Sequence, residues 1–171
     1  MISSFEDNQS EITVSPISTK QSFYPKFTSV DGIRHVQAVA TKAGIIRTAD
    51  AFEGIIFKGV GKDYDWSNLS EYIVAGRTPD VSHGLNEQVL IPQYLADRLR
   101  LKPGDRFSTY FMKDQSWKVP NLRVFEVSGV FNSGFQEIDG TFLIGDIRHI
   151  QRMNKWQPDQ VGAFEVFLHD F

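Results

Sequence analysis

Two acidic side chains late in the chain are the residues best suited to catalysis. Glu137 and Asp139 alternate within residues 134–140, so on a strand they would share one face. Two carboxylates held close together titrate at different pKa values, and such a pair can serve as the acid and base of a hydrolase. The other interpretation is a turn rich in glycine and aspartate. A carboxylate-dependent hydrolase is therefore the third-ranked function.

A glycine-containing segment at residues 59–63 matches a phosphate-binding loop only in part. A Walker A loop needs a glycine five positions before Gly61, where Ile56 stands, and serine or threonine after Lys62, where Asp63 stands. A turn at the end of a strand explains the segment better. We therefore predict that this chain binds no nucleotide and no other cofactor.

The histidines do not form a metal-binding pattern. They show neither the H-E-x-x-H nor the H-x-H spacing of metal sites. The chain has no cysteine, which excludes disulfides, thiol catalysis and cysteine-bound zinc. The sequence therefore predicts no metal site, and solvated side chains are expected for all four histidines, His35, His83, His149 and His169.

One segment is better suited to contact with a partner than to catalysis. A hairpin between the predicted strands at 107–111 and 123–130 needs about two to five loop residues, and residues 112–121 exceed this length. Exposed apolar groups on a protruding loop often mark a partner surface. The alternative is that Trp117 folds back onto Phe111 or Leu122 and completes the small core. The candidate partner-binding residues of this hairpin are Met112, Lys113, Trp117, Val119 and Pro120.

Composition limits the function classes. The chain has 171 residues, 41% of them hydrophobic, including 14 phenylalanines, which is ample for a packed core. The formal net charge is −3 and no cluster of Lys and Arg stands out along the sequence, which argues against nucleic acid as a partner. No window approaches about 20 consecutive apolar residues, so we expect no membrane span and no signal peptide within this segment.

The elements that must position the hairpin begin with a compact unit at residues 86–107. Residues 89–91 form an apolar strand, Pro92 suits the first position of a helix, and Leu95 and Leu99 lie one turn apart. Pro103-Gly104 suits a type II turn, because glycine readily takes a positive φ. Phe107, Thr109 and Phe111 then alternate along a new strand. The pattern predicts strand, short helix, turn and strand.

The flanking stretches predict a second unit. The first stretch predicts a strand at 11–17, a helix at 22–30 and a hairpin of 36–47 with 52–60, with Gly44 as a bulge. The last stretch predicts a helix capped by Asp146, with Ile147, Ile150 and Met153 on one face, and a strand at 162–169 that places Phe164, Val166 and Leu168 on one side.

The predicted fold class is therefore α+β. A split β-α-β-β-α-β subdomain is interrupted by a β-rich subdomain that contains one short helix. We expect the strand around residues 12–14 to pair antiparallel with that around 166–168, and the insert to have a separate core. The boundaries are residues 1–62 and 142–171 for the two parts of the outer subdomain, and 63–141 for the insert.

The order of these motifs resembles one family. An L-A-x-x-L-x-L-x-x-G-D-x-F unit at 95–107 is followed by Phe-Glu-Val-Ser-Gly-Val-Phe at 125–131, by Asp-Gly-Thr-Phe-Leu-Ile at 139–144, and by a helix. This order resembles the extracytoplasmic domain of ABC-transporter permeases of the macrolide-exporter and lipoprotein-releasing type (MacB, LolC and LolE, within the FtsX-like group). Residues 11–16 and 32–39 resemble its first two strands.

The resemblance implies a porter-like subdomain with an inserted sabre-like subdomain, and a domain that is not an enzyme. It implies a permease subunit in the cell inner membrane whose domain faces the periplasm and couples ATP-driven movement of membrane helices to lipoprotein release or to export of small molecules or peptides. The implied partners are a second permease subunit, the same or different, a cytoplasmic ATPase subunit reached through transmembrane helices outside this segment, and a periplasmic carrier or adaptor protein. In the lipoprotein-releasing members a hook-like hairpin at the position of residues 112–121 captures the carrier. Here the hairpin is shorter and lacks the proline-rich arm.

The alternative from another class is a stand-alone β-rich protein-protein binding module that receives a peptide at an exposed strand edge. Apolar spans on either side of this segment in the gene would exclude it.

Overall fold

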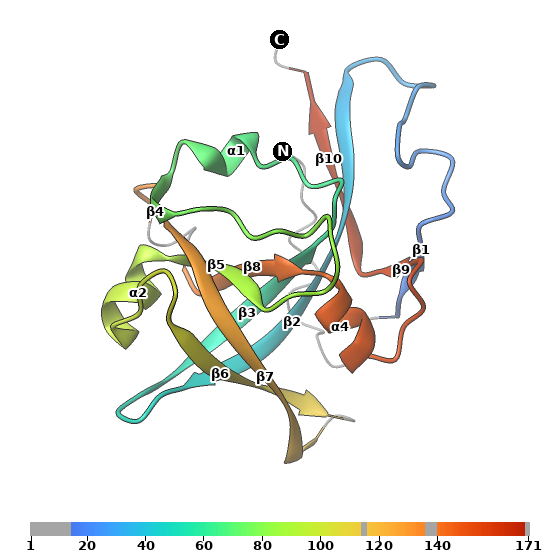
Figure 1. Cartoon of the computed structure of the whole chain (residues 1–171). Coiled ribbons are helices and arrows are strands. Elements are labelled where there is room, and N and C mark those ends of the chain that lie inside the picture. Colours follow the sequence, from blue (N-terminus) through green and yellow to red (C-terminus); the bar gives the residue numbers. More distant parts are fainter. Residues whose placement is uncertain (1–14, 114–115, 136–139, 170–171) are drawn as a thin grey trace.

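The computed structural model describes residues 15–113, 116–135 and 140–169. It is a mixed α+β structure dominated by strands, with short helices (Figure 1). The strands are β1 (Ile17–Ser18), β2 (Ile33–Arg47), β3 (Phe52–Val60), β4 (Ile73–Gly76), β5 (Gln88–Pro92), β6 (Arg106–Lys113), β7 (Ser116–Phe131), β8 (Phe142–Asp146), β9 (Gln160–Val161) and β10 (Ala163–Leu168). The helices are α1 (Ser67–Ser70), α2 (Gln93–Leu99) and α4 (Arg148–Met153).

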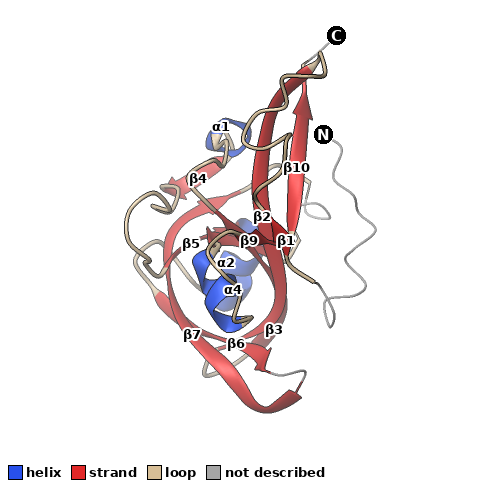
Figure 2. Ribbon diagram, turned by 90° about the vertical axis from the view of Figure 1, so that its right-hand side faces the viewer, coloured by secondary structure: helices blue, strands red, loops and turns tan. Residues whose placement is uncertain are grey.

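Six of these strands pair in a closed ring. Around the ring, β2 pairs with β3, β3 with β8, β8 with β5, β5 with β7, β7 with β6, and β6 with the second half of β2. Figure 2 looks into this ring, and Figure 1 shows α2 and α4 on its two sides. The buried faces of both helices contribute to the same apolar cluster, so the two helices cover the two open ends of the ring.

Two strands extend the sheet beyond the ring. β10 pairs antiparallel with the first half of β2, with Val166 opposite Val36, and both rise away from the ring in Figure 1. β4 pairs with the last residues of β7. On β10 the buried side chains are Glu165 and Phe167. The alternate face carries Phe164, which packs edge-on against Phe23.

The hairpin of β2 and β3 forms as predicted. The two strands pair from Val39–Val60 to Arg47–Phe52, and the N–H of Thr48 donates to the carbonyl of Ala51 at 2.8 Å across the turn. The predicted bulge at Gly44 is wrong, because the register runs through this residue without a shift. Gly44 instead faces Phe111 on β6, whose ring atom Cε1 would lie 2.8 Å from a Cβ at this position. The missing side chain therefore allows β6 to close the ring.

The unit at residues 86–107 also forms as predicted, except that Pro92 is the last residue of β5 and the helix begins at Gln93. β5 leads directly into α2, which buries Leu95 and Leu99. The helix ends at Arg100, which has a positive φ of 55°, and the N–H of Leu101 donates to the carbonyl of Ala96. Gly104 has a φ of 97°, as the predicted type II turn requires. Local sequence signals are therefore sufficient to define this unit.

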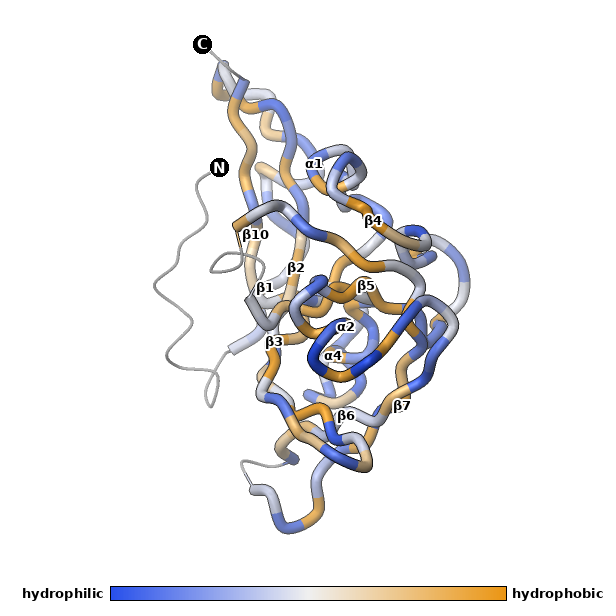
Figure 3. Tube along the Cα trace, turned by 90° about the vertical axis from the view of Figure 1, so that its left-hand side faces the viewer, coloured by the Kyte–Doolittle hydropathy of each residue, from blue (hydrophilic) through white to orange (hydrophobic). Residues whose placement is uncertain are grey.

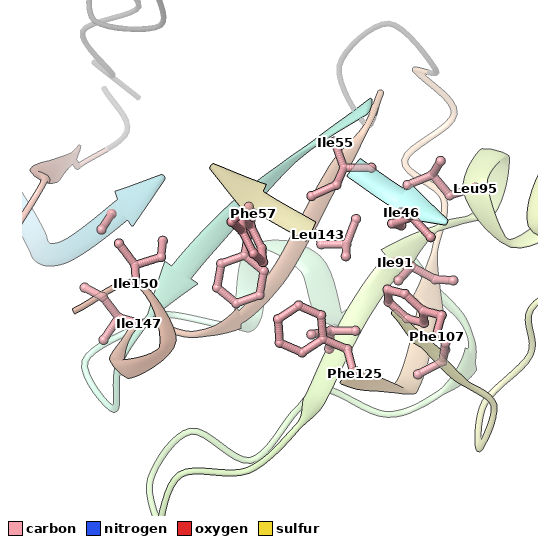
Figure 4. Packing of buried hydrophobic residues seen from close by; sticks show 14 of the residues in the cluster. Ile46, Ile55, Phe57, Ile91, Leu95, Phe107, Phe125, Leu143, Ile147 and Ile150 are labelled. Atoms are coloured by element: carbon pink, nitrogen blue, oxygen red, sulfur yellow. The ribbon is translucent and has the colours of Figure 1, made fainter. Parts of the chain in front are cut away.

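The expectation of two separate cores is wrong. One buried cluster joins Leu95, Phe107 and Phe125 of the predicted insert with Ile147 and Ile150 of the flanking part (Figure 4). The reason is the ring itself, whose strands come from both parts of the chain and enclose one interior. The subdomain boundaries at residues 62 and 141 stay a prediction.

The first predicted helix is also wrong. Residues 22–30 form turns and bends with no helix, and the peptide bond before Pro25 is cis. The segment is held from outside, because the Tyr24 hydroxyl donates to Asp63 Oδ2 at 2.7 Å. The predicted strand at 11–17 is described only at its end, in β1, which pairs antiparallel with β9. Residues 12–14 lie outside the described residues, and so does their expected pairing.

Candidate interaction surface

The candidate site lies on a long ribbon formed by β6 and β7. The two strands pair antiparallel from Arg106–Glu126 to Phe111–Asn121, and after a register shift again at Lys113–Ser116. Residues 112, 113 and 116–121, predicted as part of a protruding loop, therefore belong to paired strands. We call residues 112–121 the outer ribbon. Its surplus length is used to continue the hairpin past the ring.

The base of the ribbon is fixed in the core. Phe107, Phe111 and Phe125 are buried, and Phe125 stacks on Phe57 of β3 with ring centroids 5.1 Å apart and planes at 9°. Phe111 meets Phe125 edge-on. Aromatic pairs of this kind contribute about 0.5–1.5 kcal/mol beyond the area that they bury. The ring interior therefore holds the base of the ribbon in one place.

The predicted contact residues lie on the outer ribbon and differ in exposure. Trp117 is 43% exposed and Val119 is 70% exposed, so Trp117 is not a core residue. Lys113 is exposed, whereas Met112 and Pro120 are half-buried. In Figure 1 the tip of the ribbon points down, away from the raised ends of β2 and β10. The hydropathy colouring of Figure 3 shows polar and apolar positions mixed at this tip.

Next to the outer ribbon, β7 comes close to α4 at two arginines. Arg123 of β7 and Arg152 of α4 lie close enough for their charges to repel, which, after burial, is the second cause of a lowered pKa of the Arg123 guanidinium. Among the described residues, no carboxylate forms an ion pair with either arginine. The Arg123 Nη1 group donates to the carbonyl of Leu122 at 2.8 Å. Sequence reasoning missed this pair, because its members are distant in the chain.

The start of α4 is fixed by a buried carboxylate. Asp146 accepts the backbone N–H of Arg148 at 2.9 Å and also binds the guanidinium of Arg148. Arg148 in turn donates to the carbonyl of His83 at 2.6 Å. Asp146 thus accepts an N–H of the first helical turn, although it lies one residue before the N-cap residue, Ile147. Arg148 ties α4 to the loop before β5.

His149 is the one predicted solvated histidine that lies in the core, which corrects that expectation. Its ring meets Phe57 and Phe125 edge-on, and its Nε2 group donates to the carbonyl of Asn86 at 2.7 Å. Its Nδ1 atom is buried without a hydrogen-bond partner. Burial lowers the pKa of His149, and Arg123 and Arg152 act in the same direction, whereas the bond to Asn86 and the charge of Asp146 oppose the shift. The lowered pKa favours the neutral form of the imidazole.

The described residues hold no group of three or more His, Cys, Asp or Glu side chains that could bind a metal ion. Glu137 and Asp139, the candidate hydrolase pair, lie outside the described residues. Over the same described residues, no helix has the length and apolar character needed to cross a membrane.

A polar network near the base of β10 has a structural role. Asp63 Oδ2 accepts from the Tyr24 hydroxyl and from the N–H of Ala38 at 2.7 and 2.8 Å. The Lys58 ammonium pairs with Glu165 at 2.7 Å. These bonds connect β2, β3 and β10 with the segment at residues 61–66 and leave no open cluster of reactive groups. The phosphate-loop interpretation of residues 59–63 finds no support, because the Asp63 carboxylate is used in this network.

Comparison with known proteins gives matches only at the level of structure. No protein-family model and no curated protein sequence matches the chain. The extracellular domain of the noncanonic ABC-type transporter YknZ from Gram-positive bacteria matches with 18% identity and a TM-score of 0.53, over 82% of this chain and 68% of that one. The periplasmic region of MacB from Actinobacillus actinomycetemcomitans matches with 15% identity and a TM-score of 0.52, over 84% of this chain and 61% of that one.

This chain thus spans about two thirds of each of these solved domains. Both matches agree with the resemblance found in the order of the sequence motifs. The chain has the fold of the extracellular and periplasmic domains of ABC-type transporters.

Proposed function

We propose that this chain is the extracytoplasmic domain of an ABC-transporter permease subunit in the cell inner membrane. It is not an enzyme. It couples ATP-driven movement of membrane helices to the handling of a substrate or partner outside the membrane, either lipoprotein release or export of small molecules or peptides. The partners are a second permease subunit, a cytoplasmic ATPase subunit and a periplasmic carrier or adaptor. The observation that carries this proposal is the fold shared with the domains of YknZ and MacB.

The geometry supports such a role in two ways. The joined core of the closed ring suits a body that moves as one unit rather than as two parts with a hinge. The outer ribbon extends from this body at the end away from the raised ends of β2 and β10. A movement applied at one end is therefore delivered to the other end without being absorbed by internal rearrangement.

The outer ribbon is the proposed partner-binding site, through Met112, Lys113, Trp117, Val119 and Pro120. Trp117 and Val119 are exposed although they are apolar, and tryptophan is enriched among residues that dominate binding energy. The base of the ribbon is rigid, so little conformational freedom is lost when a partner binds.

The test uses the absence of native cysteine in this segment. The full-length protein with Lys118→Cys is expressed in its parent cells. The cells are treated with a membrane-impermeant maleimide, either intact or after lysis. Where the cells have an outer membrane, it is permeabilised first. An extracytoplasmic domain is labelled in intact cells. Labelling that appears only after lysis contradicts the proposal, and Ala96→Cys in the buried face of α2 serves as the unreactive control.

The stand-alone binding module has one observation in its favour. β4 pairs with β7 on one side, and among the described strands nothing pairs with its other edge. Val74 on this strand is 54% exposed. A peptide could add a strand here. The coding sequence on either side of residues 1–171 distinguishes the two functions, since flanking apolar spans of about 20 residues exclude a stand-alone module.

A further inference from the structure

The distribution of charge over the molecule is strongly uneven. Residues 38–48, 107–125 and 147–158 contain eight of the 18 Lys and Arg residues but only one of the 21 Asp and Glu residues, Asp114. The rest of the chain is therefore acidic, although the net charge of the whole is only −3. The three stretches lie far apart in sequence, so a search for a run of basic residues does not find them.

The fold brings these stretches together beside the outer ribbon. β2 pairs with β6 up to Gly44–Phe111, which places Lys42 and Lys113 just beyond the last pair of the ladder. The Lys42 Nζ group donates to Asn154 Oδ1 at 2.8 Å, which joins β2 to the end of α4. Arg123 of β7 lies close enough to Arg152 of α4 for the two charges to repel. We call this surface the cationic face: Lys42, Lys113, Arg123, Arg152 and Lys155.

A bound anion would stabilise the cationic face at Arg123 and Arg152. Arg123 is partly buried next to a like charge, and the described residues supply no carboxylate to Arg123 or Arg152. Bringing two like charges together raises the free energy of the folded protein, and the cost is offset when a bound anion lies between them. The exposed apolar side chains Trp117 and Val119 lie on the neighbouring ribbon.

We propose that the cationic face and the outer ribbon together bind an acidic segment of a partner protein that also carries apolar side chains. This inference rests on the proposed function and names the chemistry of its partner. Arginine and tryptophan side by side are typical of protein interfaces. The acidic remainder of the chain repels nucleic acid. An anionic membrane surface fits less well if, as the proposed function implies, the membrane helices adjoin the raised ends of β2 and β10, because the ribbon points away from these ends.

The test measures binding of the isolated chain to a fluorescein-labelled peptide that alternates glutamate and leucine, by fluorescence anisotropy. The charge reversal Lys113→Glu/Arg152→Glu changes two exposed residues of the cationic face and is expected to weaken binding at least about tenfold. The matched control Lys26→Glu/Lys62→Glu makes the same charge change at exposed positions elsewhere and should stay within about twofold. Melting temperatures of both variants establish that they fold.

Three outcomes would overturn the inference. One is equal binding of a peptide with glutamine in place of glutamate, another is an equal loss in the control variant, and the third is binding of phosphatidylglycerol vesicles or a single-stranded oligonucleotide without binding of the acidic peptide. None of these would affect the maleimide labelling of intact cells, so failure of this inference is distinguishable from failure of the proposed function.

Discussion

The interior of the closed ring and the outer ribbon are both formed in part by β6 and β7, but the side chains of these strands are buried in the interior and exposed on the ribbon. Inside the ring, β6 and β7 contribute Phe107, Phe111 and Phe125 to the buried apolar core. Beyond it, the same strands carry Trp117 and Val119 in contact with solvent. One pair of strands therefore combines a rigid base with an open contact surface. Substitutions at the base should affect folding, and substitutions on the outer ribbon should affect binding.

The largest effect is expected in the ring interior. Phe125→Ala removes a ring that stacks on Phe57 and meets Phe111 and His149 edge-on. We expect a loss of about 3–5 kcal/mol in the free energy of unfolding, as for other large-to-small changes in a close-packed core. Urea unfolding followed by circular dichroism measures it. A loss below about 1 kcal/mol would mean that the ring interior is loosely packed.

A glycine pair on β3 tests the packing of α4 against the ring. A Cβ at Gly59 would lie 2.6 Å from the Ile147 Cα, whereas a Cβ at Gly54 meets nothing within 4 Å. Gly59→Ala should therefore cost about 1–3 kcal/mol, because the backbone at Ile147 must shift. Gly54→Ala should be neutral or slightly stabilising. Equal melting temperatures for the two variants would show that α4 does not pack on β3 as described.

His149 makes the stability of the core depend on pH. Its pKa is lower in the folded protein than its ordinary value of 6.5, so the unfolded chain binds a proton first as the pH falls. Stability is full above about pH 6.5 and decreases below it until the folded-state pKa is reached, with a slope of at most about 1.4 kcal/mol per pH unit. The charges near the imidazole are Asp146, Arg123 and Arg152.

Free energies of unfolding at neutral and mildly acidic pH, for the native chain and for His149→Gln, measure this contribution. The variant should have a smaller dependence on pH in this range. An unchanged dependence would assign the effect to other groups.

Local signals in the sequence predict much of the fold. The β5–α2 unit, the β2–β3 hairpin and the buried face of α4 follow from apolar spacing, Gly104 and Asp146, all within a few residues of the elements that they define. Closure of the ring is not predictable in this way. It depends on the pairing of Gly44 with Phe111, residues far apart in sequence, and on a contact that only a missing side chain permits.

The site was predictable only in part. Surplus length and apolar residues in a polar segment identified the outer ribbon, but not that it is paired strand. The cationic face follows from the fold alone, because Lys42, Arg123 and Arg152 come from three separate stretches. The prediction of a helix at residues 22–30 is wrong for the same reason, because contacts with distant parts of the chain are not visible in a local pattern. Here the hydroxyl of Tyr24 donates to Asp63, which lies in another part of the chain.

The most direct test of the difference between interior and ribbon is Trp117→Ala in the full-length protein. Because Trp117 is 43% exposed and lies outside the core, its removal should change the stability of the domain by no more than about 0.5 kcal/mol. As an anchor of the contact surface, it should contribute about 1–2 kcal/mol or more to partner binding, so capture of the partner or transport should decrease about tenfold. We expect an unchanged melting temperature together with this loss. A variant that loses several degrees of melting temperature while its folded fraction works normally would contradict it.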